Sequence, residues 1–150
     1  MAILLLLSSV VLGVFLGAQI AEAFLLVPYW KNLKEDDFFK LHKIYGKKIH
    51  RFFAPLTIMA VFFPLITIGV YIIYQKNNNY LLLGIMGFSV IAFFLTYFLY
   101  FRKTNKNFSE RSIHNKKLKE ELIKWGKWHW SRITFEFIAF ICSLLLLMKI

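Results

Sequence analysis

Cysteine and acidic residues are scarce in this chain of 150 residues. The single cysteine, Cys142, excludes an intrachain disulfide and leaves no basis for a thiolate metal cluster. Eight Asp and Glu residues oppose nineteen Lys and Arg, for a formal net charge of +11. The hydrophobic content of 59% exceeds what a soluble domain of this length needs. A helical bundle that faces lipid requires such a composition.

Several catalytic motifs are also missing. No Glu-x-x-His motif occurs, whereas di-iron bundles draw one from each of two helices. There is no Gly-rich phosphate loop, and no serine stands at a nucleophile elbow. A mononuclear metal site built from His129, Glu136, Glu22 or His50 stays open as an alternative, because two histidines and a carboxylate can bind iron. Our prediction contains no metal ligand, and the residues point to no particular cofactor.

Four long apolar segments dominate the chain. A membrane-spanning helix needs about 20 mostly apolar residues, and the fourth segment reaches that length only if residues 128–132 belong to it. Trp128, Trp130 and a snorkelling Arg132 suit the interface and favour that inclusion. The sequence therefore predicts an all-α fold, a single integral membrane four-helix bundle over residues 1–150. The predicted spans are residues 2–27, 52–74, 80–101 and 128–148.

The positive charge predicts the topology. Seventeen of the nineteen Lys and Arg residues fall within residues 28–51 and 102–132, which four spans place on one side. Cationic loops stay on the cytoplasmic side. We therefore expect cytoplasmic basic loops, both termini outside, a tight external turn at residues 75–79, and a bacterial plasma membrane as the location. Anionic headgroups are the expected partners of these charges, and nucleic acid is not.

A cleaved signal peptide is the rival interpretation of the first segment, because Ala21-Glu22-Ala23 resembles a small-residue cleavage site. Two features oppose it. The apolar run is longer than an h-region of about 7–15 residues, and no positive charge precedes it. We expect the segment to be retained as a helix.

The basic loops show helical patterns of their own. Asp37 can cap a short amphipathic helix over residues 38–45 that lies on the membrane and that Gly46 would end. In the second loop, Leu118, Leu122 and Trp125 repeat at helical spacing. We therefore predict an interfacial helix in the first loop and a cytoplasmic extension of the fourth helix.

Two carboxylates lie inside the predicted membrane segments. At 1.5 Å per residue, Glu22 lies about 9 Å inside the Pro28 end of its helix, and Glu136 lies about 6 Å beyond Arg132 on an oppositely directed helix. The two acids therefore reach a similar depth. Intramembrane acids usually face the bundle interior and have a partner. His129 and Arg132 share one helical face with Glu136 and are the expected partners.

Other polar residues are expected at the same depth. Gln19 precedes Glu22 by three residues, and Gly13 and Gly17 form a small-residue ridge that allows another helix to approach. His50 precedes the second span, and Asn105 follows the third. We predict a pocket open to the cytoplasm, with three catalytic residues and four that bind the substrate. The catalytic candidates are His129, Arg132 and Glu22, and the substrate-binding candidates are Gln19, His50, Asn105 and Glu136.

Short motifs across nearly the whole chain resemble a known family. Gly13-x-x-x-Gly17, Asn105 and Trp125-x-x-Trp128-His129-x-x-Arg132 are similar to the anthrone-oxygenase-like group of small four-helix membrane proteins. Most members of that group are uncharacterised. The resemblance implies a four-helix membrane bundle and, for the few members with assigned chemistry, oxidation of a hydrophobic aromatic substrate by dioxygen without an obvious cofactor. It carries over Asn105, His129 and Arg132, but not the two acids.

Two functional hypotheses follow, and transport ranks third because no broken inverted repeats are visible. In the first, the chain is an oxidoreductase or oxygenase that takes a lipophilic aromatic or quinone-like substrate from the bilayer. His129 or Glu22 would accept a proton, and Arg132 would stabilise an enolate or phenolate. In the second, the chain is a non-catalytic assembly or accessory subunit in a homo- or hetero-oligomer. Arg132 and Glu136 would then form an ion pair that only orients the bundle.

Overall fold

The computed structural model describes residues 1–74 and 79–149, and every regular element in these residues is a helix. Four long helices account for almost all of them, as the sequence predicts. Two of the four are continuous, and two pass through a π-helical turn. Their segments are α1 (Ala2–Ala21), a π-helical turn (Glu22–Leu26) and α2 (Val27–Asn32); α3 (Glu35–Tyr74); α4 (Tyr80–Thr96), a π-helical turn (Tyr97–Phe101) and α5 (Arg102–Glu110); and α6 (Asn115–Leu147).

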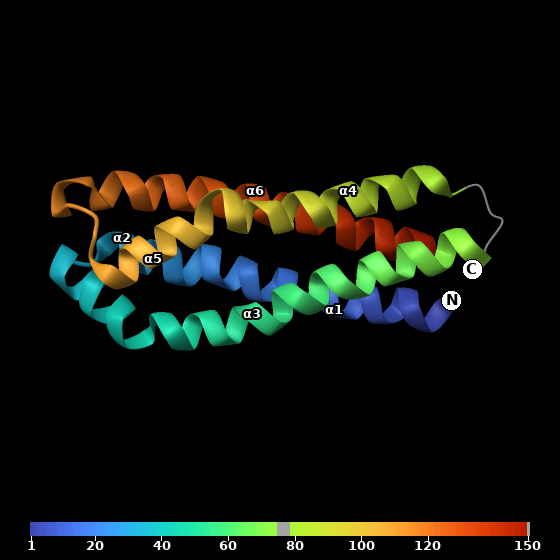
Figure 1. Cartoon of the computed structure of the whole chain (residues 1–150), viewed down its shortest axis with the longest axis horizontal. Helices are drawn as coiled ribbons and strands as arrows, with labels where there is room; N and C mark the ends of the chain where they lie inside the picture. The colour runs from blue at the N-terminus through green and yellow to red at the C-terminus, as the bar shows by residue number, and fades with distance from the viewer. Residues whose placement is uncertain (75–78, 150) are drawn as a thin grey trace.

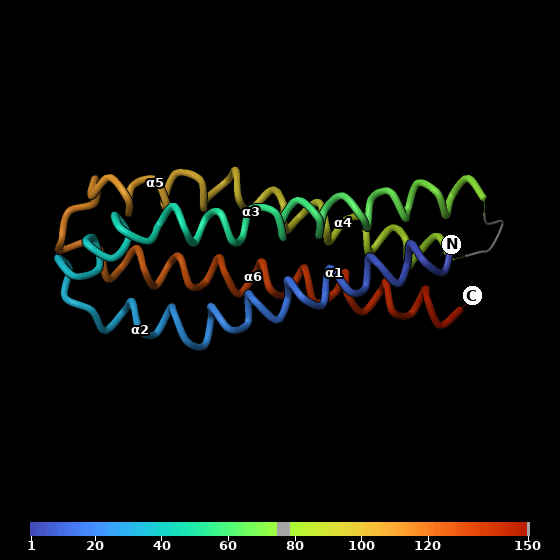
Figure 2. Tube along the Cα trace, turned by 90° about the horizontal axis from the view of Figure 1, so that it is seen from below, coloured from blue at the N-terminus to red at the C-terminus, as the bar shows by residue number. Residues whose placement is uncertain are grey.

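The four helices form an elongated antiparallel bundle. α1 and α4 each pack against both α3 and α6, which gives an up-down-up-down arrangement. Both chain termini lie at one end of the bundle, and the α2–α3 and α5–α6 links lie at the other (Figures 1 and 2). We call the latter the linked end. The two basic stretches of the sequence therefore meet at one end of the molecule.

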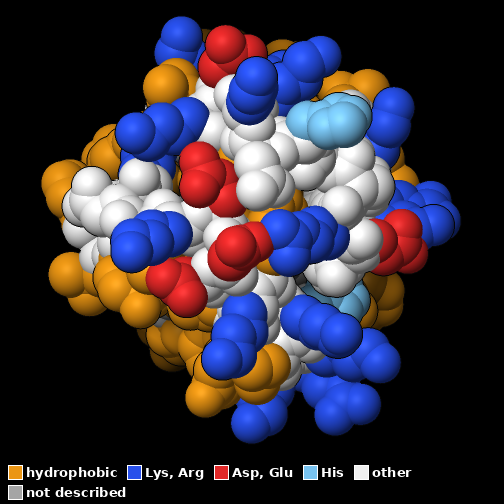
Figure 3. Space-filling model, turned by 90° about the vertical axis from the view of Figure 1, so that its left-hand side faces the viewer, with side chains coloured by type: hydrophobic (Ala, Val, Ile, Leu, Met, Phe, Trp, Pro, Cys, Tyr) orange, Lys and Arg blue, Asp and Glu red, His pale blue; other side chains and the backbone are white. Residues whose placement is uncertain are grey.

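Each of the four helices is long and apolar enough to cross a membrane. They contain 31, 40, 31 and 33 residues, whereas about 20 suffice for a span. Their outward faces expose large apolar side chains such as Ile73, Leu81 and Phe88. The helical residues beyond the predicted spans lie mainly at the linked end, where Lys and Arg ring the surface (Figure 3).

The buried side chains form two main clusters. One fills the half of the bundle near the termini, where hydroxyl pairs join the helices: Ser8 Oγ lies 2.8 Å from Thr67 Oγ1, and Ser9 Oγ lies 2.9 Å from Ser143 Oγ. The other cluster lies at the linked end and is rich in aromatic rings. Its members are Val27, Trp30, Phe38, Phe39, Tyr100, Phe101, Phe108, Leu118, Leu122 and Trp125.

The first loop differs from its prediction. Residues 38–45 are helical, but they belong to α3, which continues through Gly46 without a break. A glycine inside a helix costs only about 1 kcal/mol relative to alanine. Burial of Phe38 and Phe39 against the linked-end cluster offsets that cost. The prediction that Gly46 ends a separate interfacial helix is therefore wrong.

Most of the turn predicted at residues 75–79 lies outside the described residues. Asn79 is the exception, and it connects two helix ends. Its Nδ2 donates to the Tyr71 hydroxyl at 3.0 Å, and its Oδ1 accepts from Lys149 Nζ at 3.1 Å. Asn79 therefore bridges the end of α3 and the residues that follow α6.

Candidate buried polar site

Five polar side chains from two helices meet inside the bundle. Gln19 and Glu22 come from the end of α1 and the start of its π-helical turn, and His129, Arg132 and Glu136 come from α6. Gln19, Glu22, His129 and Glu136 are buried, and Arg132 is partly buried. The spacing of three and four residues along each helix places these side chains on the facing sides of α1 and α6. We call this group the polar cluster.

His129 is fixed by contacts on two sides. Its Nε2 lies 3.0 Å from the main-chain oxygen of Gln19 and 3.7 Å from Oε2 of Glu22. Its ring stacks on the Trp125 indole, with the ring centroids 4.9 Å apart. Because Nε2 donates to the Gln19 carbonyl, Nδ1 carries the lone pair of the neutral ring. The contacts therefore favour one tautomer of His129.

The π-helical turn begins where these contacts form. The N–H of Glu22 is shared between the carbonyls of Ala18 and Gln19. The same Gln19 carbonyl oxygen therefore accepts from both the Glu22 N–H and His129 Nε2. Single π-turns inside α-helices are frequent at functional sites. The local backbone of the first helix thus helps to hold the histidine of the fourth.

Gln19 and Glu136 form the second contact between the helices. The Gln19 Nε2 donates to Oε2 of Glu136. The other oxygen of each side chain, Gln19 Oε1 and Glu136 Oε1, is buried and has no hydrogen-bond partner. A buried polar atom without a partner costs about 1–3 kcal/mol. Both oxygens therefore retain the capacity to accept a further hydrogen bond.

Arg132 lies among aromatic rings. Its guanidinium carbon is 5.4 Å from the ring centroid of Phe15, 5.5 Å from that of Phe101 and 5.9 Å from that of Phe93. Its Nη2 donates to Thr57 Oγ1 at 3.1 Å. Its Nε is buried and has no partner. The cation is therefore held by cation–π contacts and one hydroxyl, and it is absent from the ion pairs among the described residues.

Two of the predicted site residues lie away from the polar cluster. His50 is exposed on α3. Asn105 is exposed on α5, where its Oδ1 accepts a hydrogen bond of 2.9 Å from Trp125 Nε1. Asn105 therefore supports the indole on which His129 stacks without touching the cluster itself. The structure brings together the other five predicted residues.

Sequence reasoning missed the aromatic part of the site. Phe15, Phe93 and Phe101 surround Arg132, but the chain contains seventeen phenylalanines and nothing in the sequence distinguishes these three. The sequence analysis also assigned no role to Thr57, whose hydroxyl accepts from Arg132. In residues 1–74 and 79–149, no three His, Cys, Asp or Glu side chains are arranged to hold a metal ion.

His42 lies outside the polar cluster, in the part of α3 that precedes the predicted span. Its Nδ1 lies 3.1 Å from the Phe38 carbonyl oxygen, and its ring packs on Phe38, Trp30 and Phe108. Burial lowers the pKa of His42 below its usual range, and the hydrogen bond to Phe38 opposes that change only in part. His42 is therefore neutral at pH 7 and is part of the apolar packing at the linked end.

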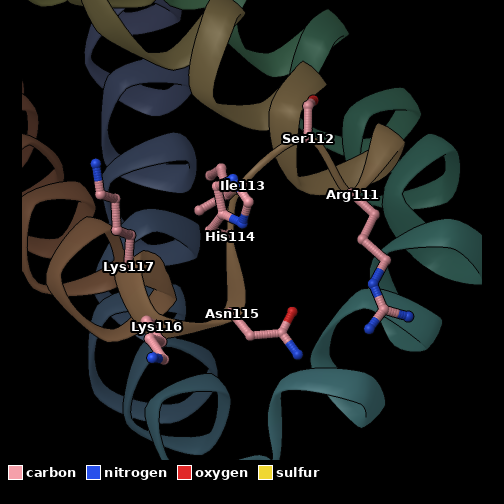
Figure 4. Close-up of a pocket in the computed structure, with 7 residues that line it drawn as sticks. All are labelled: Arg111, Ser112, Ile113, His114, Asn115, Lys116 and Lys117. Carbon is pink, nitrogen blue, oxygen red and sulfur yellow. The ribbon is translucent and has the colours of Figure 1, made fainter.

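Two surface hollows lie near basic residues. One, of about 580 Å³, lies at the α5–α6 link and is lined by Arg111, Ser112, Ile113, His114, Asn115, Lys116 and Lys117 (Figure 4). Arg111 there pairs with Asp36 of α3. The other, of about 410 Å³, lies between α2 with its preceding π-helical turn and α6, and His129 is among its lining residues. The second hollow gives the polar cluster a neighbouring space.

The chain was compared with known proteins at the level of families, individual sequences and structures. No family model, no curated protein and no solved structure matches it.

Proposed function

We propose that the chain is an integral membrane protein whose polar cluster binds a lipophilic aromatic or quinone-like molecule and transfers its proton, as an oxidoreductase or oxygenase would. The observation that carries the proposal is the set of buried atoms without partners: Gln19 Oε1, Arg132 Nε and Glu136 Oε1. They offer one donor and two acceptors. A phenolic or quinol hydroxyl, which both donates and accepts, complements them.

The charges of the cluster support proton transfer. Two carboxyl groups, Glu22 and Glu136, accompany one guanidinium and one imidazole. With His129 neutral, Arg132 compensates only one carboxylate. An uncompensated charge is strongly unfavourable in a buried site. The cluster therefore reaches neutrality when it holds one proton, and that proton can be exchanged with a hydroxylic ligand.

The proposed membrane topology follows from the ends of the bundle. The linked end carries most of the basic side chains (Figure 3) and also Trp30, Trp125, Trp128 and Trp130. Tryptophan is typical of a membrane interface, and an excess of lysine and arginine is typical of its cytoplasmic side. We place the linked end in the cytoplasm, both termini outside, and the extra turns of α3, α5 and α6 beyond the lipid. The location we expect is a bacterial plasma membrane.

The resemblance to the anthrone-oxygenase-like group agrees with this proposal. His129 and Arg132, which the resemblance carries over, lie in the polar cluster, and Asn105 supports Trp125 beside it. On this proposal the oxidant is dioxygen and the substrate is a lipophilic phenol or hydroquinone. His129 or Glu22 accepts the hydroxyl proton, and Arg132 stabilises the resulting anion.

The experiment that tests the proposal is ligand analysis of the purified protein. Wild type, Arg132→Gln and the matched control Arg102→Gln, which alters an exposed arginine, are purified in detergent, extracted with organic solvent and analysed by mass spectrometry. We expect a phenolic or quinone-like compound with wild type and the control, and its loss from Arg132→Gln at unchanged helix content. Finding only membrane phospholipid with all three proteins would contradict the proposal.

One observation favours the accessory-subunit function instead. Three phenylalanine rings and Thr57 already surround Arg132, so the guanidinium can act as a fixed structural centre. Under this alternative, Arg132→Gln lowers thermal stability and abundance together, and no variant separates ligand binding from folding.

A further inference from the structure

The hollow of about 410 Å³ beside the polar cluster is a groove between the first and fourth helices. It opens to the outside of the bundle, and of the polar cluster only His129 is among its lining residues. Apolar side chains form most of its walls, and two lysines stand among them. The lining residues include Phe24, Lys31, Gly126, Lys127, His129 and Trp130.

A glycine of α6 leaves room for this groove. A Cβ placed on Gly126 would lie 3.4 Å from Lys31 Nζ and 3.7 Å from Val27 Cγ1. The Lys31 ammonium therefore lies against the backbone of α6 at Gly126, the one position where α6 has no side chain. Any residue larger than alanine at this position would displace the lysine or fill the groove.

The groove is amphipathic. Phe24 and Trp130 form its apolar wall, in an edge-to-face contact with ring centroids 5.4 Å apart, and both are exposed, by 64% and 45%. Lys31 and Lys127 supply positive charge. No Asp or Glu is among the described residues that line the groove, and neither lysine is in an ion pair among those residues. An occupant must bring negative charge and an apolar chain together.

We propose that this groove binds one anionic phospholipid, with its phosphate between Lys31 and Lys127 and an acyl chain against Phe24 and Trp130. Charge complementarity selects the occupant, because a zwitterionic lipid adds a cation beside two uncompensated lysines. Each basic residue near an anionic surface adds favourable binding energy. The inference rests on the proposed membrane insertion, but not on the proposed chemistry of the polar cluster.

Trp130 gives a direct measurement, since bromine atoms on an acyl chain quench a neighbouring indole. The protein is reconstituted in phosphatidylcholine vesicles, and dibrominated phosphatidylglycerol or dibrominated phosphatidylcholine is titrated in. The contribution of Trp130 is the difference between wild type and Trp130→Phe. We expect quenching of Trp130 at a mole fraction of the anionic lipid roughly tenfold lower than of the zwitterionic lipid.

Variants distinguish binding of the lipid in this groove from a general attraction between anionic lipid and the basic linked end. Lys31→Gln/Lys127→Gln should remove the preference, and Gly126→Leu should remove it while both lysines remain. The matched control Lys40→Gln/Lys119→Gln removes the same charge from exposed positions of the linked end and should keep the preference. Circular dichroism verifies that each variant is folded. If Gly126→Leu does not fold, the comparison of Lys31→Gln/Lys127→Gln with Lys40→Gln/Lys119→Gln tests the inference.

Three results would overturn the inference: equal quenching by the two lipids, a preference that survives Lys31→Gln/Lys127→Gln, or a preference lost equally in the Lys40→Gln/Lys119→Gln control. The last would assign the effect to the net charge of the linked end. Failure of membrane insertion gives a different result, because then neither brominated lipid quenches any tryptophan.

Discussion

The imidazole of His129 donates from Nε2 to the main-chain oxygen of Gln19 across 3.0 Å, and so joins the fourth helix to the backbone of the first. This bond forms where the first helix enters its π-helical turn. The acceptor is a main-chain oxygen, which every residue type at position 19 would present. A substitution at position 19 therefore does not remove the acceptor. The contact therefore constrains the relative positions of α1 and α6 directly.

Replacing His129 by leucine should lower stability. The change keeps an apolar side chain in contact with Trp125, but it removes the donor and leaves the Gln19 carbonyl without it. We expect a loss of about 1–3 kcal/mol in the free energy of unfolding, measured by thermal unfolding in detergent. His114→Leu, at an exposed position, is the control. Equal midpoints for wild type and His129→Leu would show that the bond contributes nothing.

The two glycines of the small-residue ridge should respond differently to substitution. A Cβ on Gly13 would lie 3.1 Å from Phe140 Cε2, whereas one on Gly17 would meet nothing within 4 Å. We expect Gly13→Leu to destabilise the bundle by about 1–3 kcal/mol through overpacking. Gly17→Leu should not destabilise it, because nothing is crowded and a helical glycine costs about 1 kcal/mol relative to alanine. Thermal unfolding of both variants measures the difference, and equal effects would contradict it.

Stability should fall with acidity because of His42. Its pKa is lowered in the folded protein, so below the ordinary histidine pKa of about 6.5 the unfolded chain binds a proton that the folded chain does not. The contribution is fully present above pH 6.5 and is lost as pH falls toward the folded pKa. Unfolding midpoints are measured at pH 7.5 and at lower pH, for wild type and two variants. His42→Phe should show a smaller decrease than wild type or His50→Phe, and the same decrease in all three would exclude the role of His42.

The topology can be tested by chemical labelling. In a Cys142→Ser background, single cysteines are placed at Lys34, Lys116 and Asn78, and intact cells are treated with a membrane-impermeant maleimide. We expect label only at position 78, with positions 34 and 116 reacting after the membrane is opened. Label at 78 and 116 under the same condition would end the four-span topology. Residue 78 lies outside the described residues, so this test does not depend on its placement.

The sequence predicts the four helices and most of the polar cluster for one physical reason. Charged and amide side chains inside long apolar segments are costly, so Gln19, Glu22 and Glu136 were expected to face inward, and the structure places them there. The depth of a residue in the membrane does not determine whether it faces the bundle interior when it lies near the end of a helix. His50 and Asn105 are exposed residues outside the polar cluster, and the contact of Asn105 with Trp125 depends on tertiary packing.

The helical path at the linked end was harder to predict. Gly46 looked like a helix end, because local signals do not include the burial of Phe38 and Phe39 that keeps α3 intact. The two π-helical turns, Glu22–Leu26 and Tyr97–Phe101, have no signature in the sequence. The aromatic surroundings of Arg132 depend on three helical segments at once, and no local pattern contains that information.

The π-helical turn at Glu22–Leu26 also sets a register. Along the first helix the buried positions Leu16, Ala23 and Trp30 lie seven residues apart, so one side faces the core on both sides of the turn. Each residue of a helix adds about 100° of rotation. Deleting a single residue from the turn would therefore rotate Trp30 away from Trp125 and Lys31 away from Gly126, so both the aromatic packing of the linked end and the proposed lipid groove depend on the length of this one turn.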